Sequence, residues 1–467
     1  MKRMIFSLLL TIAMVANSMA QRASFNGSWY GTLAGGPYSM NLVFHISQQG
    51  DSVAVTWDSP MQQAYGLDAT ATIDNDSLSI DMPIVQATYQ ARLAGDRLTG
   101  WYSQGDMNMK LSMTQDSNYL ADRPQVAAIL ADTHKPYRSE DVTLTNGDIT
   151  LAGTLTLPNE GDKFPGVVLV VGSGMLDRDE SMFGHKAHLL LADALSRQGF
   201  AVLRYDKRGV GASIGGHCTD PTAQLAGDAM AAVRYLASRP EVDASRVGIL
   251  GHSEGGIIAI MNAAQYPDEI AFIVSMAGVG LPHYEYALTT KWDIERVMGI
   301  NRDEAEKRFY EKVYAIIGTE RDTTVMRERM LAMLAEDPYY QHYLEQALPK
   351  YPEYTASDFN EAMVEQNITP ENCEMLQYDP AWDLEHVKCP MLAVNGALDF
   401  QVGSDANLAA ISRHVPHATV KAYENLNHLF QDCSGQDSLL DYAGIKETMS
   451  PVVIEDIVTW LKRVVKP

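Results

Sequence analysis

Four short, mainly apolar runs separated by helix-favouring segments constrain the fold of this chain more than any other feature. Each run is followed by glycine, aspartate or asparagine. Continuous apolar runs predict strands buried on both faces, and helices between them predict right-handed crossovers. The sequence therefore predicts an α/β fold with a doubly wound, mainly parallel sheet over residues 138–467, in which ligands bind beyond the carboxyl ends of the strands. The runs span residues 167–171, 201–205, 247–250 and 391–394.

Residues 21–116 have a different pattern. Stretches of about five residues alternate apolar and polar side chains and are separated by turn residues, with no helical period. This pattern predicts a small antiparallel β barrel or sandwich. Its aromatic side chains suit either a carbohydrate-binding platform or the core of the domain, and one-sided alternation favours the core. These aromatic residues are Trp29, Tyr30, Trp57 and Trp101.

Two further segments complete the predicted domain organisation. Residues 117–137 lack strong periodicity and are interpreted as a linker. Between residues 281 and 380 the strand-like apolar runs no longer recur, and helix-favouring residues dominate. This insertion is either a cap over the ligand crevice or a helical excursion at the edge of the sheet, and we favour the cap.

Residues 1–20 have the features of a secretory signal peptide. Lys2 and Arg3 precede an apolar run over residues 4–15, and the small residues Ser18 and Ala20 precede the expected cleavage point. The run is shorter than the roughly 20 residues that a membrane-spanning helix needs. We therefore predict an exported protein without a membrane span, and both a periplasmic and a secreted location stay open.

The net charge argues against one class of partner. The 36 Lys and Arg residues oppose 59 Asp and Glu residues, which gives a net charge of −23 over 467 residues. Such an acidic chain is not expected to bind nucleic acid. The four cysteines are too few for a disulfide framework in a chain of this length, and their spacing is not that of a metal site, so their disulfide state stays open. They are Cys218, Cys373, Cys389 and Cys433.

A GxSxG motif, Gly251-His252-Ser253-Glu254-Gly255, follows the third apolar run and precedes a helix-favouring segment. A serine at a sharp turn between a strand and a helix is typical of a nucleophile elbow. The flanking Gly251 and Gly255 have a steric cause, because side chains there would collide with neighbouring backbone. Ser253 is therefore the candidate nucleophile.

A serine hydroxyl needs a histidine base that a carboxylate holds in one tautomer. In a fold with this elbow the three residues follow in the order Ser, Asp, His. Asp399 comes shortly after the fourth apolar run and His428 lies further along the chain, so they are the candidate acid and base. The alternatives are His414 or His417 as the base, Glu424 as the acid, and a helix-capping role for Asp399.

Acyl transfer also needs donors for an oxyanion. The backbone amide of Glu254, directly after the nucleophile, is the first candidate, and that of Ser173 or Gly174, after the first apolar run, is the second. A plain tight turn is the alternative for this glycine-rich loop. Residues 177–179 and 206–209 mix aspartate with Lys and Arg. They either bind a substrate carboxylate or, as we favour, fix loops beneath the site through Arg–Asp pairs.

These motifs together resemble bacterial α/β-hydrolase-fold serine esterases of the EstD-like kind with an N-terminal β domain. The resemblance covers nearly the whole chain after residue 20 and implies carboxylic-ester hydrolysis, with Ser253, Asp399 and His428 at the triad positions. Met175 departs from the family pattern, since many relatives carry proline there. The residues that carry the resemblance are Gly27–Gly31, Trp57–Pro60, Gly172–Gly174, Asp177–Asp179, Arg204–Gly209, Gly251–Gly255 and Asn425–Gln431.

The sequence thus predicts an exported serine carboxylesterase that needs no metal or organic cofactor. Its expected substrate is a small-molecule or carbohydrate-linked ester. Two alternatives stay open: a serine peptidase or aminopeptidase of the same fold, and a polysaccharide-binding surface protein that uses the N-terminal β domain. The natural ester and the oligomeric state also stay open.

Overall fold

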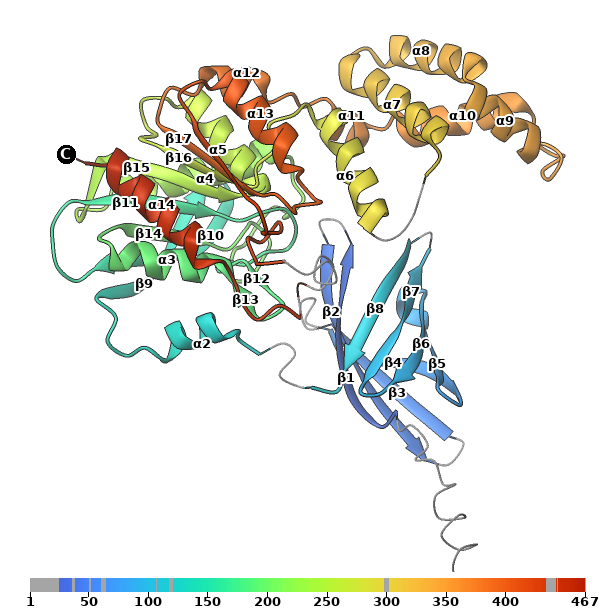
Figure 1. Cartoon of the computed structure of the whole chain (residues 1–467), viewed down its shortest axis with the longest axis horizontal. Helices are drawn as coiled ribbons and strands as arrows, with labels where there is room; N and C mark the ends of the chain where they lie inside the picture. Colours follow the sequence, from blue (N-terminus) through green and yellow to red (C-terminus); the bar gives the residue numbers. More distant parts are fainter. Residues whose placement is uncertain are drawn as a thin grey trace, which may run out of the picture. The chain divides into compact units, whose positions relative to one another are not determined.

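The computed structural model describes residues 25–35, 38–49, 52–59, 64–105, 107–116, 121–297, 302–433, 442 and 444–466. The predicted signal peptide, residues 1–20, lies outside the described residues. The chain divides into two compact units, Met1–Ala121 and Asp122–Pro467, and each is described by itself (Figure 1).

The first unit is a closed antiparallel barrel in which each strand pairs with the next and β8 closes on β1. Alternate side chains point inward, so Trp29 and Trp57 are buried in the core, whereas Trp101 is 47% exposed. The prediction of core packing is confirmed for Trp29 and Trp57. Tyr30 is only partly buried, and Trp101 points to the opposite face of its strand. The strands are β1 (Gly27–Gly35), β2 (Tyr38–Gln49), β3 (Ser52–Ser59), β4 (Ala64–Asp74), β5 (Ser77–Met82), β6 (Ala87–Ala94), β7 (Arg97–Gln104) and β8 (Met107–Thr114).

The second unit is built on an eight-stranded sheet with the order β18-β17-β16-β15-β11-β14-β10-β9. The pairs from β14 through β11 to β18 are parallel, and β10 and β9 extend the sheet in antiparallel pairing. The predicted fold class is therefore confirmed. The strands are β9 (Tyr137–Asn146), β10 (Ile149–Pro158), β11 (Phe164–Val170), β14 (Ala201–Tyr205), β15 (Val242–His252), β16 (Ile273–Met276), β17 (Met391–Gly396) and β18 (Thr419–Tyr423).

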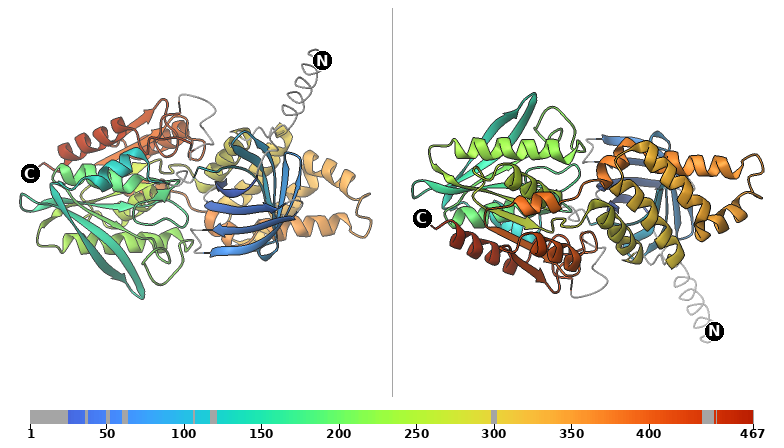
Figure 2. Two further views of the ribbon diagram at one scale, coloured as in Figure 1. Left: turned by 90° about the horizontal axis from the view of Figure 1, so that it is seen from below. Right: turned by 90° about the horizontal axis from the view of Figure 1, so that it is seen from above.

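Helices cover both faces of this sheet (Figure 2). One apolar cluster joins α4, α5, α12 and α13 to one face, and a second joins α2, α3 and α14 to the other. A parallel sheet needs this double cover because both of its faces are apolar. The helices are α2 (Pro124–Ala131), α3 (Ala187–Arg197), α4 (Thr222–Ala237), α5 (Glu254–Gln265), α12 (Ala381–His386), α13 (Ser404–His414) and α14 (Pro451–Val464), and the short hairpin β12 (Ser181–Met182) and β13 (His185–Lys186) precedes α3.

The segment interpreted as a linker differs from that expectation. Residues 124–131 form helix α2, whose Val126 is fully buried in the cluster with α3 and α14. Val126 is the one buried side chain of this helix. A single buried residue gives no visible period in the sequence. The packing of Val126 is nevertheless enough to attach the segment to the second unit.

The helical insertion lies between β16 and β17 and has its own apolar core, which includes Phe309, Met330 and Tyr340. Its first helix also contacts the sheet unit, because the Thr290 hydroxyl donates a hydrogen bond to the Gln401 carbonyl (2.6 Å). Gln401 follows β17 closely, so the middle of this helix lies near the carboxyl edge of the sheet. The helices are α6 (His283–Val297), α7 (Glu304–Thr319), α8 (Thr323–Glu336), α9 (Pro338–Ala347), α10 (Ala356–Asn367) and α11 (Pro370–Leu376).

Candidate active site

Ser253 occupies a strained turn between β15, which ends at His252, and α5, which begins at Glu254. Its φ of +53° and ψ of −115° are rarely adopted by a residue with a side chain. A Cβ on Gly251 would lie 1.9 Å from the Gly255 carbonyl oxygen, and one on Gly255 would lie 2.1 Å from the Val170 carbonyl oxygen. Both glycines of the motif are therefore required sterically, and the strain is of the kind found at functional sites.

The structure brings Asp399 and His428 together. The His428 Nδ1 atom lies 2.7 Å from Asp399 Oδ2, and both residues are 5% exposed. The other carboxylate oxygen, Oδ1, accepts hydrogen bonds from the backbone amides of Gln401 and Val402 (both 2.8 Å). Because the carboxylate accepts, Nδ1 carries the hydrogen and Nε2 has its lone pair free for a proton.

The imidazole of His428 lies beside the elbow. Its ring centroid is 4.7 Å from that of His252, the residue before the nucleophile. In the described part of the chain, no hydrogen bond joins the Ser253 hydroxyl to this ring; catalytic hydrogen bonds often tighten only when substrate binds. The rival histidines have other partners, since His414 contacts Glu385 (3.1 Å) and His417 contacts the Cys389 carbonyl (3.2 Å).

The candidate oxyanion donors also approach Ser253. Glu254 is the first residue of α5, so its amide has no carbonyl partner within the helix. A Cβ built on Gly172 would lie 3.4 Å from the Ser253 Cβ, which puts the loop carrying Ser173 and Gly174 against the nucleophile. Gly174 has a φ of +95°, which glycine adopts without strain.

Most charged side chains of the two predicted polar clusters bind each other or neighbouring loops. Arg178 forms a bidentate pair with Asp206 (2.9 and 2.8 Å), and Arg204 lies 2.8 Å from Asp179. This confirms the interpretation that Arg–Asp pairs fix loops beneath the site. Arg208 pairs with Asp228, outside the clusters (2.7 and 2.9 Å).

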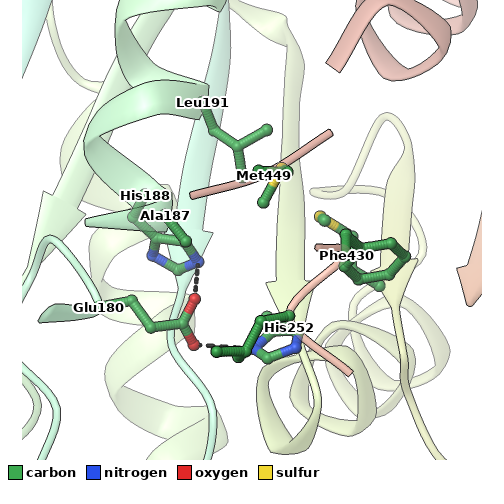
Figure 3. A pocket seen from close by; sticks show the side chains of 9 residues that line it. Glu180, Ala187, His188, Leu191, His252, Phe430 and Met449 are labelled. Carbon is green, nitrogen blue, oxygen red and sulfur yellow. Dashed lines mark hydrogen bonds and ion pairs between the residues drawn. The ribbon is translucent and has the colours of Figure 1, made fainter. Parts of the chain in front are cut away.

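A buried cluster behind the elbow was not predicted from the sequence (Figure 3). Glu180 Oε1 accepts hydrogen bonds from the Gly172 amide (3.0 Å) and from His252 Nδ1 (2.9 Å). His252 Nε2 in turn donates to the His428 carbonyl (3.0 Å). Both partners of the His252 ring are acceptors, so the ring carries two protons and is an imidazolium. One carboxylate thereby connects the oxyanion loop, the elbow and the His428 loop.

Electrostatics support this assignment of charge. Burial raises the pKa of Glu180, but the charge of the His252 ring and the hydrogen bonds from His252 and Gly172 outweigh burial and hold it below its ordinary value. Burial lowers the pKa of His252, yet Glu180 and the His428 carbonyl raise it above the ordinary value. Burial lowers the pKa of His188 to about 4, so that ring is neutral. A cavity of about 10 Å³ lies among these side chains, which is roughly the space of one water molecule.

Among the described residues, no group of three or more His, Cys, Asp or Glu is arranged to hold a metal ion. None of the helices in the described ranges has the length and apolar character needed to cross a membrane. Cys218, Cys373 and Cys389 carry free thiols.

The chain is similar to several known proteins. The family model Hydrolase_4, described as serine aminopeptidase, S33, matches residues 183–346, a range that contains Ser253 and ends before Asp399 and His428. Esterase EstD of Thermotoga maritima is 26% identical over 332 residues, which covers 70% of this chain and 68% of that protein. An uncharacterized protein of Mycobacterium tuberculosis is 29% identical over 212 residues, 44% of this chain and 70% of that protein.

Similar solved structures cover a comparable share of the chain. The Pyrococcus furiosus esterase Pf2001 has a TM-score of 0.43 at 16% identity and covers 74% of this chain and 98% of its own. Est1E of Butyrivibrio proteoclasticus, solved with ferulic acid, has a TM-score of 0.40 at 15% identity and covers 69% and 96%.

Proposed function

The chain has an α/β-hydrolase fold and resembles EstD-like bacterial esterases, and from this premise we propose that it is a serine carboxylesterase working through an acyl-enzyme. Ser253 is the nucleophile, His428 the general base and Asp399 the residue that orients it. The observation that carries the proposal is the 2.7 Å contact between His428 and Asp399 beside a strained serine elbow. The three residues follow in the chain order that this elbow requires.

The mechanism follows from these groups. His428 Nε2 takes the proton of the Ser253 hydroxyl as the oxygen attacks the ester carbonyl, and Asp399 stabilises the resulting imidazolium. The amides of Glu254 and of Ser173 or Gly174 donate hydrogen bonds to the oxyanion of the tetrahedral intermediate. The imidazolium then protonates the departing alcohol. Water attacks the acyl-enzyme with His428 again as base, which releases the acid and restores Ser253.

An aminopeptidase is the second candidate, because the family model carries that description. Such an enzyme needs a free carboxylate near the nucleophile to bind the substrate amine. The Glu254 side chain is the carboxylate nearest in sequence to Ser253, and it is occupied: Lys207 Nζ lies 2.6 Å from Oε2 and the Thr222 hydroxyl donates to Oε1 (3.0 Å). This pairing favours a neutral ester over a cationic peptide terminus.

We also propose that the enzyme is exported, on the basis of residues 1–20.

The test is hydrolysis of p-nitrophenyl acetate, butyrate and octanoate by the wild type and by Ser253→Ala. We expect turnover to fall by about 10⁴-fold or more in the variant, because the covalent route is lost. Alanyl and leucyl p-nitroanilides, assayed beside the esters, measure aminopeptidase activity. Ester turnover that is unchanged in Ser253→Ala, or a preference for the anilides over the esters, would overturn the proposal.

A further inference from the structure

Lys207 lies between the two halves of the proposed oxyanion site. Its side chain is 5% exposed, although lysine is among the residues least often buried. Its ammonium group, Nζ, donates a hydrogen bond to the Gly172 carbonyl (3.2 Å) and another to Glu254 Oε2 (2.6 Å). One cation therefore connects the loop after β11 to the first residue of α5. These are the two segments whose backbone amides face the oxyanion in the proposed mechanism.

The contact with Gly172 fixes a whole peptide group. The Gly172 carbonyl and the Ser173 N–H belong to the same planar trans unit and point in opposite directions. An ammonium on the carbonyl side therefore determines where the Ser173 N–H points. It also polarises the peptide, which makes that N–H a stronger donor. The preceding peptide is held as well, since the Gly172 N–H donates to Glu180 Oε1 (3.0 Å).

We propose that Lys207 is a positioning residue for ester hydrolysis, which aims the Ser173 N–H at the oxyanion by holding the Gly172 carbonyl. The inference rests on the proposed function, because it assigns a role within the same reaction. Lys207 does not touch the reacting atoms. It acts on the transition state through the peptide that it orients, so its removal lowers kcat much more than it changes KM.

A second role for Lys207 would be to neutralise the Glu254 carboxylate, which otherwise puts a negative charge near the developing oxyanion. The two roles predict different results for a double variant. If neutralisation were the whole role, then Lys207→Met would have no effect once Glu254→Gln has removed the charge. If Lys207 orients the peptide, Lys207→Met still lowers kcat in the Glu254→Gln background, because the Gly172 carbonyl has lost its donor.

The experiment measures kcat and KM for p-nitrophenyl butyrate in the wild type, Lys207→Met, Glu254→Gln and the double variant. It also measures inhibition by an alkyl trifluoromethyl ketone, whose adduct with Ser253 carries an oxyanion. We expect Lys207→Met to lower kcat by about 100-fold in both backgrounds and to weaken inhibition by a similar factor, with KM changed by less than about threefold. The double variant leaves no unpaired carboxylate at position 254. If Lys207→Met does not fold, the comparison of the double variant with Glu254→Gln still tests the inference.

Lys312→Met is the matched control. Lys312 lies 2.7 Å from Asp337, a carboxylate that is 4% exposed in the helical insertion. Like Lys207→Met, this variant leaves a carboxylate without its lysine partner, although Lys312 is 52% exposed and Asp337 keeps its hydrogen bonds from the Tyr339 and Tyr340 amides. It is expected to lower the melting temperature without changing kcat. An equal kcat in the double variant and in Glu254→Gln would overturn the inference, as would a loss of kcat in Lys312→Met as large as that in Lys207→Met. A wild type without Ser253-dependent turnover would overturn the proposed function itself, which is a separate outcome.

Discussion

The barrel and the α/β unit bury different kinds of side chain. The barrel core is made of apolar and aromatic residues such as Leu42, Phe44 and Tyr89, and within its described strands Ser59 is the buried residue with a polar or charged side chain. The α/β unit buries many charged groups, and those around Lys207 and Glu180 lie at the carboxyl edge of its sheet. Both units fold, so buried charge is not needed for a stable core here.

The difference indicates what the buried charges are for. Removing a charge from water costs several kcal/mol, and apolar replacements are often as stable or more so. The barrel has an apolar core, which costs little desolvation energy. The α/β unit buries charged side chains, which costs more, at the places where loops must be held in particular positions. We therefore expect substitutions in the barrel core to affect stability alone. Substitutions in the charged edge are expected to affect turnover first.

The largest expected effect is that of Asp399→Asn on turnover. An asparagine amide in contact with Nδ1 favours the tautomer with the hydrogen on Nε2, so the ring no longer accepts the Ser253 proton. We expect kcat for p-nitrophenyl butyrate to fall by about 10⁴-fold. The melting temperature should change little, because Asn still offers an acceptor to the Gln401 and Val402 amides. A fall in kcat of less than tenfold would contradict the assignment of Asp399.

Trp29→Ala is the converse experiment in the barrel. Trp29 is 1% exposed and its indole donates to the Phe25 carbonyl (2.8 Å). The substitution leaves a large cavity and is expected to destabilise the barrel by about 3–5 kcal/mol. Calorimetry of the full chain, with tryptophan fluorescence as a second probe, measures the shift of the barrel transition. An unchanged kcat is expected, and a parallel loss of turnover would break the contrast between the two units.

Low pH is expected to destabilise the α/β unit more than the barrel, and this effect is smaller than those of the two substitutions. Burial lowers the pKa of His185 and of His188 from 6.5 to about 4. The unfolded chain therefore binds more protons than the folded chain below pH 6.5, so the stabilisation from these neutral rings is present above pH 6.5 and is lost as the pH falls toward 4. We expect the α/β unit to lose up to about 3 kcal/mol for each histidine.

Thermal unfolding between pH 7 and pH 4.5 measures this loss. Among the described residues of the barrel, the shifted groups are Asp58, whose pKa lies below 3.8, and Tyr89 and Tyr102, whose pKa lies above 10. None of them titrates in this interval, so the barrel transition should move little. His188→Leu should reduce the slope of the α/β transition. Equal slopes for the two transitions would show that the buried histidines do not control the acid response.

Local patterns predicted much of the fold. The apolar run 201–205 coincides with β14, and α3 (Ala187–Arg197) lies in the segment between the first two apolar runs, where a helix was expected. Such elements are visible because their burial repeats along the sequence. Helix α2 was missed because one buried valine gives no repeat.

In the candidate site too, residues that belong to local motifs were predicted, and residues that meet through long-range contacts were not. Ser253 was identified by a local steric motif, and Asp399 and His428 by the chain order that the fold imposes; their catalytic roles stay predictions. The sequence indicated no role for His252 beyond its place in the motif, and Glu180 was not identified at all. Their contact joins residues 72 positions apart and depends on the path of one loop. Glu180 even adopts a φ of +54° there, a strain that no sequence pattern reveals.

The position of the helical insertion has an evolutionary consequence. The insertion leaves the sheet after β16 and returns at β17, and these two strands are direct neighbours, with Ile273 opposite Met391. Its ends lie close together, because the His283 amide donates a hydrogen bond to the Tyr378 carbonyl (2.9 Å), and its apolar core is its own. A gene can lengthen, exchange or lose such a segment as one piece while the sheet and the elbow are inherited unchanged. Lineages that share this chemistry are thus free to diverge in the esters that they accept.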